Sequence, residues 1–573
     1  MAPAVERRVE DAASAAAMRP ASVLMKPSRL AAIQPSRISA SRALINRAVA
    51  GRWRITRKSF AIDAVGKGIA DYRIDTGTMM LSFPVYSFEP SPHGRTGRII
   101  GRAWDMMGAL VEGDMSAGDF ETTRQELPKL YRGRATPGTL VWCRSNRSGR
   151  VFRKTQEALA RGEQPAIGDI AETCYVMRNT GLDGNGTFGT RSFMALEPGH
   201  PLRSSLSAQM LCAYMMRVFA QDIIEHLAAQ ASPGAARLDP SVARFIGVGN
   251  GSALGLMFYV NNHPRLIDRW LGIREQSIAH ASQLDLTDGR IDLLDNLVGQ
   301  ALHFRREDRV AYENATPSGV VADDLAVIRA ALAELRDRRR AANAIAPTLA
   351  DLPDYYGRPI GMDAEETLNS LSLELVPDFA DALVDTLVVD EEPRPQPFMS
   401  VAVLRELVRS DYAWAFKLGI DPDQPGDYVW YKSVTAEEPR RGLRSEVPEG
   451  TVNLGLDLAR MILALDRDLA ASDARLSVAR FLVANPERRA IVTRVQTLAD
   501  CKYHSVEADI MSPDFVPAHM TRLLNVGIHG IDKARDFLNR NLRGVLFHGA
   551  PLPEDIASGT ADRHWFNPSE PAA

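Results

Sequence analysis

The stretch "SAQMLCAYMMRVFAQDIIEHLAAQ", residues 207–230, carries the clearest structural signal in this 573-residue chain. Its apolar residues recur every three or four positions, as they do in an α-helix that is buried among other elements. The pattern therefore predicts a long buried helix, and similar patterns follow it along the chain.

Further amphipathic patterns predict more helices downstream. The segment at 264–283 opens on Pro264, and proline is well accepted as the first residue of a helix because an N–H has no helical partner there. Comparable periods occur at 325–345, 452–470 and 532–547. Helices are therefore expected over much of the chain.

Patterns typical of strands are fewer. They occur at 51–63, 77–90 and 138–145, where apolar and β-branched residues gather between turn residues. The predicted fold is thus mainly α with a smaller β component (α+β), with a multi-helix core and its strands concentrated in the N-terminal quarter.

The length of the chain exceeds what one compact core normally holds, so several domains are expected. Proline, glycine and polar residues cluster at 229–241, 344–363 and 388–400, which indicates boundaries. A weak echo between 70–160 and 426–499 raises the hypothesis that two weakly related lobes arose by duplication. The predicted division is an N-terminal helical extension (1–50), an N-terminal α+β lobe (51–235), a central helical region (236–390) and a C-terminal helical lobe (391–573).

Composition favours a soluble protein of the cytoplasm. Apolar residues make up 45% and charged residues 24%, and the net charge of −3 provides no general attraction for nucleic acid or an anionic membrane. No apolar run reaches the roughly 18 residues of a membrane span. The four cysteines lack metal-binding or redox spacing and are expected to be reduced and mostly buried; they are Cys143, Cys174, Cys212 and Cys501.

The glycine-rich segment "GVGNGSALG", residues 247–255, resembles a nucleotide-binding loop only in part. It has no lysine for a phosphate loop of the Walker type, and Ala253 stands where a dinucleotide-binding fingerprint has its third glycine. The remaining interpretation is a loop leading to a helix that begins near Ser252. Free N–H groups at such a helix start attract carboxylate or phosphate, so Asn250 and Ser252 are predicted to bind an anion. The alternative is a tight turn or a self-capped helix start.

A second segment of similar chemistry spans 177–193 and contains another "GNG" at 184–186. Both "GNG" segments flank the helix predicted at 207–230, so they can approach each other. The alternative is a turn-rich hairpin that uses these residues for their backbone freedom. The side chains predicted to bind substrate here are Arg178, Asn185, Thr187 and Arg191.

His263 lies just before the helix predicted at 264–283. The electric field at the start of a helix lowers the pKa of a histidine and favours the neutral form that acts as a base. His263 is therefore a candidate catalytic residue, and the alternative is that it packs in an Asn-capped turn.

The segment "DYVWYKSVTAEEPRRG", residues 427–442, combines aromatic, acidic and basic side chains. Arg440 and Arg441 can bind an anion through their guanidinium groups, and Tyr431 or Lys432 can act as an acid or a base when removed from water. The alternative is a surface loop in which acids and arginines pair with one another.

No spacing in the sequence predicts a metal site. None of the eleven histidines forms an H-x-H, H-x-x-x-H or H-E-x-x-H pattern. Basic runs lack interleaved aromatic residues and are expected on solvated helix faces, so nucleic acid is not expected as a partner. The sequence identifies no cofactor.

Together these features favour a cytoplasmic enzyme that acts on a small anionic metabolite, carrying a carboxylate or phosphate, by acid–base chemistry of the lyase or hydrolase type. One alternative is a flavin- or nicotinamide-dependent oxidoreductase that holds its phosphates at helix ends. Another is a non-catalytic helical scaffold or ligand-binding protein. No membrane partner is expected, and assembly into a homo-oligomer is left open.

Overall fold

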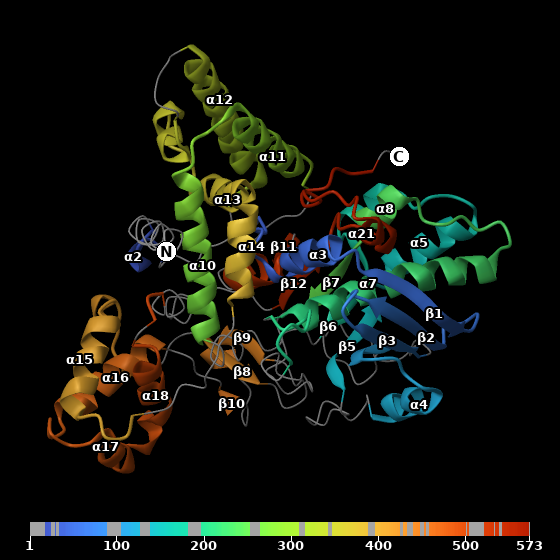
Figure 1. Ribbon diagram of the computed structural model, residues 1–573. Helices are drawn as coiled ribbons and strands as arrows, with labels where there is room; N and C mark the ends of the chain where they lie inside the picture. The colour runs from blue at the N-terminus through green and yellow to red at the C-terminus, as the bar shows by residue number, and fades with distance from the viewer. Residues whose placement is uncertain are drawn as a thin grey trace.

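The structure is a computed structural model, and it describes residues 18–24, 29, 34–88, 105–126, 138–180, 196–204, 206–251, 264–308, 316–341, 347–387, 396–424, 428–432, 439–446, 452–453, 458–499, 501–503, 521–531, 533–537 and 541–571. Helices predominate among these residues and surround one large sheet (Figure 1). This arrangement confirms the predicted α+β class with many helices.

The large sheet has nine strands in the order β1-β2-β3-β4-β5-β6-β7-β12-β11. Neighbouring strands are antiparallel except β6 and β7, which run parallel. The strands are β1 (Arg54–Ile62), β2 (Gly68–Asp75), β3 (Met80–Ser87), β4 (Met106–Glu112), β5 (Thr139–Arg147), β6 (Tyr175–Thr180), β7 (Gly247–Gly251), β11 (Lys533–Phe537) and β12 (Asn541–Leu546). The three strand-like patterns of the N-terminal quarter are therefore confirmed as β1, β3 and β5. A second sheet joins β10 (Val452–Asn453), β8 (Tyr428–Lys432) and β9 (Pro439–Leu443) in that order.

Helix α7 (Ser207–Ala231) confirms the buried helix predicted at 207–230. It contacts β3 to β7 and is itself covered by α3 (Ala40–Ala50) and α5 (Arg150–Ala160). Gly108 of β4 makes this close approach possible, because a Cβ atom there would lie 2.9 Å from the ring of Phe83 and 3.3 Å from Cε of Met216. The long apolar run of the sequence thus becomes the helix that covers one face of the sheet.

The predicted helices at 264–283 and 325–345 are confirmed as α10 (Pro264–Ser282) and α12 (Ser318–Ala341). α12 packs against α11 (Asp288–Glu307), and together they extend the core of the sheet. The other helices are α2 (Ala21–Leu24), α4 (Ala117–Glu126), α6 (Ile167–Ala171), α8 (Pro240–Phe245), α13 (Met362–Ser372), α14 (Pro377–Asp385), α15 (Val401–Asp411), α16 (Leu458–Ala470), α17 (Val478–Ala484), α18 (Arg489–Thr497) and α21 (Pro553–Ser558), with a π-helix at Thr521–His529.

A second apolar core lies among helices alone. Side chains of α10, of α14 to α18 and of the π-helix contribute to it, and Trp270, Tyr412 and Phe481 are among its buried members. Figure 1 shows α15 to α18 gathered in one group, away from the large sheet. The helical part of the chain therefore has its own packed interior.

The prediction of a helix at 532–547 is wrong. The segment forms the antiparallel pair β11 and β12, and β12 also pairs with β7 on its other side. Gly544 fits beneath Ile531, since a Cβ atom at Gly544 would lie 2.7 Å from two of its carbon atoms. The hydrogen bonds of the strand ladder therefore override a helical period that rests on few residues. At 452–470 the helix begins only at Leu458, because Val452 and Asn453 belong to β10.

The large sheet draws its strands from three of the four predicted segments: β1 to β6 precede residue 236, β7 lies in the central segment, and β11 and β12 follow residue 390. The four-part division and the related lobes remain predictions. All four cysteines are free thiols and buried, as expected. Among the described residues, no helix is long and apolar enough to cross a membrane.

Candidate functional site

Most of the side chains predicted for the site lie outside the part of the chain whose side chains the structure describes. His263, Asn185, Thr187, Arg191 and Ser252 are outside the described residues. For Asn250, Tyr431, Lys432, Arg440 and Arg441 only the backbone is described, in strands β7, β8 and β9. Arg178 lies in β6 and is half-buried.

The backbone places these residues in two groups. In the large sheet Arg178 pairs with Gly249, and the neighbouring Asn179 pairs with Asn250. Because β6 and β7 are parallel, the chain leaves both strands at the same end of the sheet. The first "GNG" segment, at 184–186, lies outside the described residues, so its predicted approach to the second stays a prediction. In the small sheet Tyr431 pairs with Arg440. No described strand pairing joins the two sheets.

The prediction of a loop or tight turn at 247–251 is wrong, because these residues form strand β7. Two of its glycines have a packing role. A Cβ atom at Gly249 would lie 2.8 Å from the ring of Tyr175, and one at Gly247 would lie 2.5 Å from the carbonyl oxygen of Leu546. Contact inside the sheet therefore explains these glycines without a ligand.

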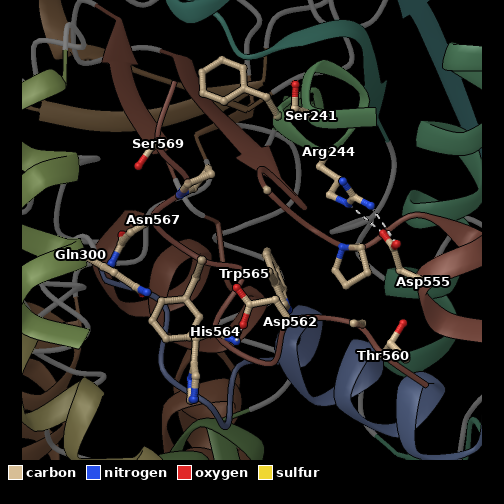
Figure 2. Close-up of a pocket in the computed structure, with 16 residues that line it drawn as sticks. Ser241, Arg244, Gln300, Asp555, Thr560, Asp562, His564, Trp565, Asn567 and Ser569 are labelled. Carbon is tan, nitrogen blue, oxygen red and sulfur yellow. Dashed lines mark hydrogen bonds and ion pairs between the residues drawn. The ribbon is translucent and has the colours of Figure 1, made fainter. Parts of the chain in front are cut away.

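A pocket with a volume of about 540 Å³ lies elsewhere, where the C-terminal segment folds back over α8, α11 and α21 (Figure 2). We call it the C-terminal pocket. Its walls combine aromatic rings with amides, hydroxyls and charged groups. The lining residues are Ser241, Arg244, Phe245, Gln300, Gly549, Pro551, Asp555, Thr560, Ala561, Asp562, His564, Trp565, Phe566, Asn567, Pro568 and Ser569.

The strongest charges of the C-terminal pocket neutralise each other. Arg244 donates from Nε and from Nη2 to the two carboxylate oxygens of Asp555, each at 2.8 Å, and Figure 2 shows the two groups facing each other. This pair lowers the pKa of Asp555 and raises that of Arg244. Asp555 also accepts the backbone N–H of Leu552 at 2.8 Å. The guanidinium of Arg244 is thus already occupied by a carboxylate of the same chain.

His564 connects the pocket to a buried charge cluster. Its Nδ1 atom lies 4.0 Å from Oε2 of Glu374, and its side chain is 27% exposed. Glu374 is buried and accepts hydrogen bonds from Arg37, at 2.8 Å, and from Arg42. Burial lowers the pKa of His564, and the nearby Arg42 lowers it further, while Glu374 opposes this change. The imidazole is therefore neutral at neutral pH and can accept a proton.

Several polar atoms beside the pocket have no hydrogen-bond partner within the described part of the chain. They are Oε1 of Gln300, Nε1 of Trp565 and Nδ1 of His564. Asn567 is different, since its Nδ2 donates to Oε1 of Gln34 at 3.0 Å. Buried polar atoms usually have partners, so these three atoms lack hydrogen bonds that a molecule reaching them would supply.

The residues of the C-terminal pocket were not predicted from the sequence. The segment "TADRHWFNPS", residues 560–569, does carry a signal, because it combines acid, imidazole, indole and amide in ten positions. The same kind of density drew attention to 427–442. Its partners on α8 and α11 lie more than 250 positions away, and their proximity follows only from the fold.

The comparisons with known proteins add no functional information. No protein-family model, no curated protein and no solved structure matches the chain. Among the described residues, no group of three or more histidine, cysteine, aspartate or glutamate side chains is placed to hold a metal ion.

Proposed function

We propose that this protein binds a small, uncharged polar molecule in the C-terminal pocket and acts on it by acid–base chemistry. The observation that carries the proposal is that the pocket's arginine is already paired with Asp555, whereas neutral polar groups beside it lack partners. Such groups exchange hydrogen bonds with hydroxyls and amides of a ligand. The rings of Phe245, Trp565 and Phe566 provide an apolar wall.

Charge favours an uncharged ligand here over an anion. Arg244 and Asp555 cancel, and Asp562 adds a carboxylate that accepts the backbone N–H of His564 at 2.8 Å. A carboxylate or phosphate on the ligand would meet net negative charge. The hypothesis of an anionic substrate therefore applies only to the site residues proposed from the sequence, and we do not propose it for the C-terminal pocket.

In the proposed chemistry His564 is the base. Its Nδ1 is buried toward Glu374, and the exposed part of the ring lines the pocket, so a substrate hydroxyl there can give its proton to the imidazole. Glu374 lies 4.0 Å from Nδ1 without a hydrogen bond, and its charge stabilises the imidazolium that results. This keeps the acid–base reaction class expected from the sequence, and His263, Tyr431 and Lys432 remain proposals for a separate site.

Isothermal titration calorimetry tests the proposal. The titrants are free monosaccharides, polyols and amino-acid amides, each compared with its phosphorylated or carboxylated counterpart. We expect uncharged compounds to bind more tightly than the charged counterparts. Gln300→Leu removes the unpartnered amide and should weaken binding about tenfold. Gln125→Leu, on the exposed surface of α4, is the matched control.

Chemistry is tested separately from binding. His564→Gln should retain binding of an uncharged compound while its conversion, followed by NMR, disappears. Saturable binding only of the charged counterparts would contradict the proposal. So would equal effects of Gln300→Leu and Gln125→Leu.

A further inference from the structure

A second pocket, with a volume of about 480 Å³, lies at the N-terminal end of α7. We call it the Arg203 pocket. Its lining includes Arg47 of α3, Asp385 at the end of α14, and His200, Arg203 and Ser204 from the segment that leads into α7. It shares no lining residue with the C-terminal pocket.

Positive charge exceeds negative charge among these residues. Arg47 donates to Asp385 at 2.7 Å, so these two cancel, and Arg47 also donates to the carbonyl oxygen of Pro201 at 3.0 Å and to Ser204 Oγ at 3.2 Å. Arg203 is different. Its guanidinium has no hydrogen bond or ion pair with any described residue, and its Nε atom is buried.

A half-buried arginine without a partner is unusual, because withdrawing a guanidinium from water is costly unless its N–H groups find acceptors. Arg203 lines the pocket, so an acceptor inside the pocket would supply the missing bonds. Planar guanidinium groups bind the oxygens of phosphate and carboxylate groups especially well. The residue therefore indicates an anionic ligand.

The surroundings favour the same class of ligand. α7 has 25 residues, and its N-terminal end carries the positive end of the helix dipole. The hydroxyls of Ser204 and Ser207 bond to each other at this end, and either can also donate to an oxygen. His200 holds the preceding turn, since its Nδ1 accepts the N–H of Leu202 at 3.0 Å. An arginine without a partner among the described residues, a hydroxyl and a helix start together suit a tetrahedral oxyanion.

We propose that the Arg203 pocket is a binding site for a phosphate group, either free phosphate or the phosphate of a small ester. Arg203 makes the ionic contact and Ser204 adds a hydrogen bond. Asp385 limits the affinity, because its carboxylate lies in the same pocket and holds Arg47. The site is independent of the C-terminal pocket and of the chemistry proposed there.

Calorimetry of the full chain with inorganic phosphate tests this site, at constant ionic strength with chloride as the replaced anion. Glycerol phosphate and acetate are the second and third titrants. We expect saturable binding of phosphate, and tighter binding of glycerol phosphate indicates that the natural ligand is an ester. Saturable binding of acetate with none of phosphate would overturn the proposal.

Arg203→Ala should weaken phosphate binding by about tenfold to a hundredfold, the loss of a charge-assisted hydrogen bond. The thermal midpoint should change little, because the side chain has no partner among the described residues. Arg203→Lys keeps the charge without the planar fork and should bind with intermediate affinity. Arg153→Ala on α5, whose side chain is 70% exposed, is the control and should match the unmodified protein.

Asp385→Asn gives a change in the opposite direction. Removing the carboxylate frees Arg47 and lowers the repulsion, so phosphate affinity should rise several-fold. This variant tests the proposed phosphate site even if Arg203→Ala does not fold. Unchanged or weaker phosphate binding in Asp385→Asn, or unchanged binding in a folded Arg203→Ala, would overturn the proposal.

Discussion

The C-terminal pocket and the Arg203 pocket each contain an arginine, but the two arginines are in opposite states. Arg244 donates from Nε and Nη2, one edge of its guanidinium, to the carboxylate of Asp555, whereas Arg203 meets no acceptor among the described residues. An arginine binds a ligand anion only when no carboxylate of the chain already occupies it. The presence of arginine in a pocket therefore says less about the ligand than the partners of that arginine do.

The largest expected effect is a loss of stability when the buried charge cluster beside the C-terminal pocket is broken. The C-terminal pocket rests on Glu374, which is buried between Arg37 and Arg42, and Arg42 lies 3.7 Å from the ring centroid of Phe566 in the pocket wall. Glu374→Gln leaves two buried guanidinium groups without their shared charge. We expect a loss of about 3 kcal/mol or more in the free energy of unfolding, measured with urea.

Burial alone would raise the pKa of Glu374, but Arg42 and Arg37 outweigh burial and lower it. The stabilisation is therefore present above the pKa of an unfolded glutamate and is lost as the pH falls through the lower pKa of the folded state. Glu365→Gln is the control, because Glu365 is 47% exposed and lies 3.4 Å from Arg29; it should cost less than about 1 kcal/mol. Equal costs would show that the buried cluster does not support the pocket.

An effect of intermediate size is expected from a substitution that frees the arginine of the C-terminal pocket, so that it resembles the arginine of the Arg203 pocket. Asp555→Asn removes the charge that occupies Arg244 while keeping an oxygen for the N–H of Leu552. The C-terminal pocket should then bind inorganic phosphate, which calorimetry would detect as a second site beside the Arg203 pocket. The cost in stability should stay near 1 kcal/mol or below, since Arg244 is 41% and Asp555 22% exposed. If no second phosphate site forms, the pairing of Arg244 with Asp555 does not explain why the two pockets prefer different ligands.

The sequence predicts those elements of the fold that depend on residues close together in the chain. The period of apolar residues predicted α7 and α10, including the start at Pro264, because a helix is built from neighbours in the chain. The strands β11 and β12 were mistaken for a helix, since β11 pairs with β12 and β12 pairs with β7, almost 300 positions earlier. The local spacing of apolar residues therefore predicts helices, whereas the pairing of strands that are distant in the sequence is seen only in the structure.

The candidate sites show the same limit. Gly249 looked like part of a ligand loop, but the ring of Tyr175 occupies the space where its side chain would stand. Arg203 drew no attention, because its distinction is the absence of a partner, which no sequence pattern encodes. The prediction that Arg178 and Asn250 lie near each other has support from the pairing of β6 with β7, whereas their role in binding remains a proposal.

The smallest expected effect is a pH dependence that only the C-terminal pocket should show. Burial lowers the pKa of His564, with Arg42 adding to this and Glu374 opposing it, so the folded state favours the neutral ring. The corresponding stability is present above the ordinary histidine pKa of 6.5 and is lost as the pH falls through the lower pKa of the folded state.

His564→Gln removes this contribution, so the difference in unfolding free energy between the variant and the unmodified protein should change below pH 6.5 and stay constant above it. Measuring a difference matters, because burial raises the pKa of Asp71 to about 6 and this carboxyl titrates in the same range. Phosphate binding at the Arg203 pocket should be the same in both proteins at each pH. A difference that is flat from pH 5 to pH 8 would mean that the ring of His564 is not held in its neutral form, and the case for His564 as a base would fail with it.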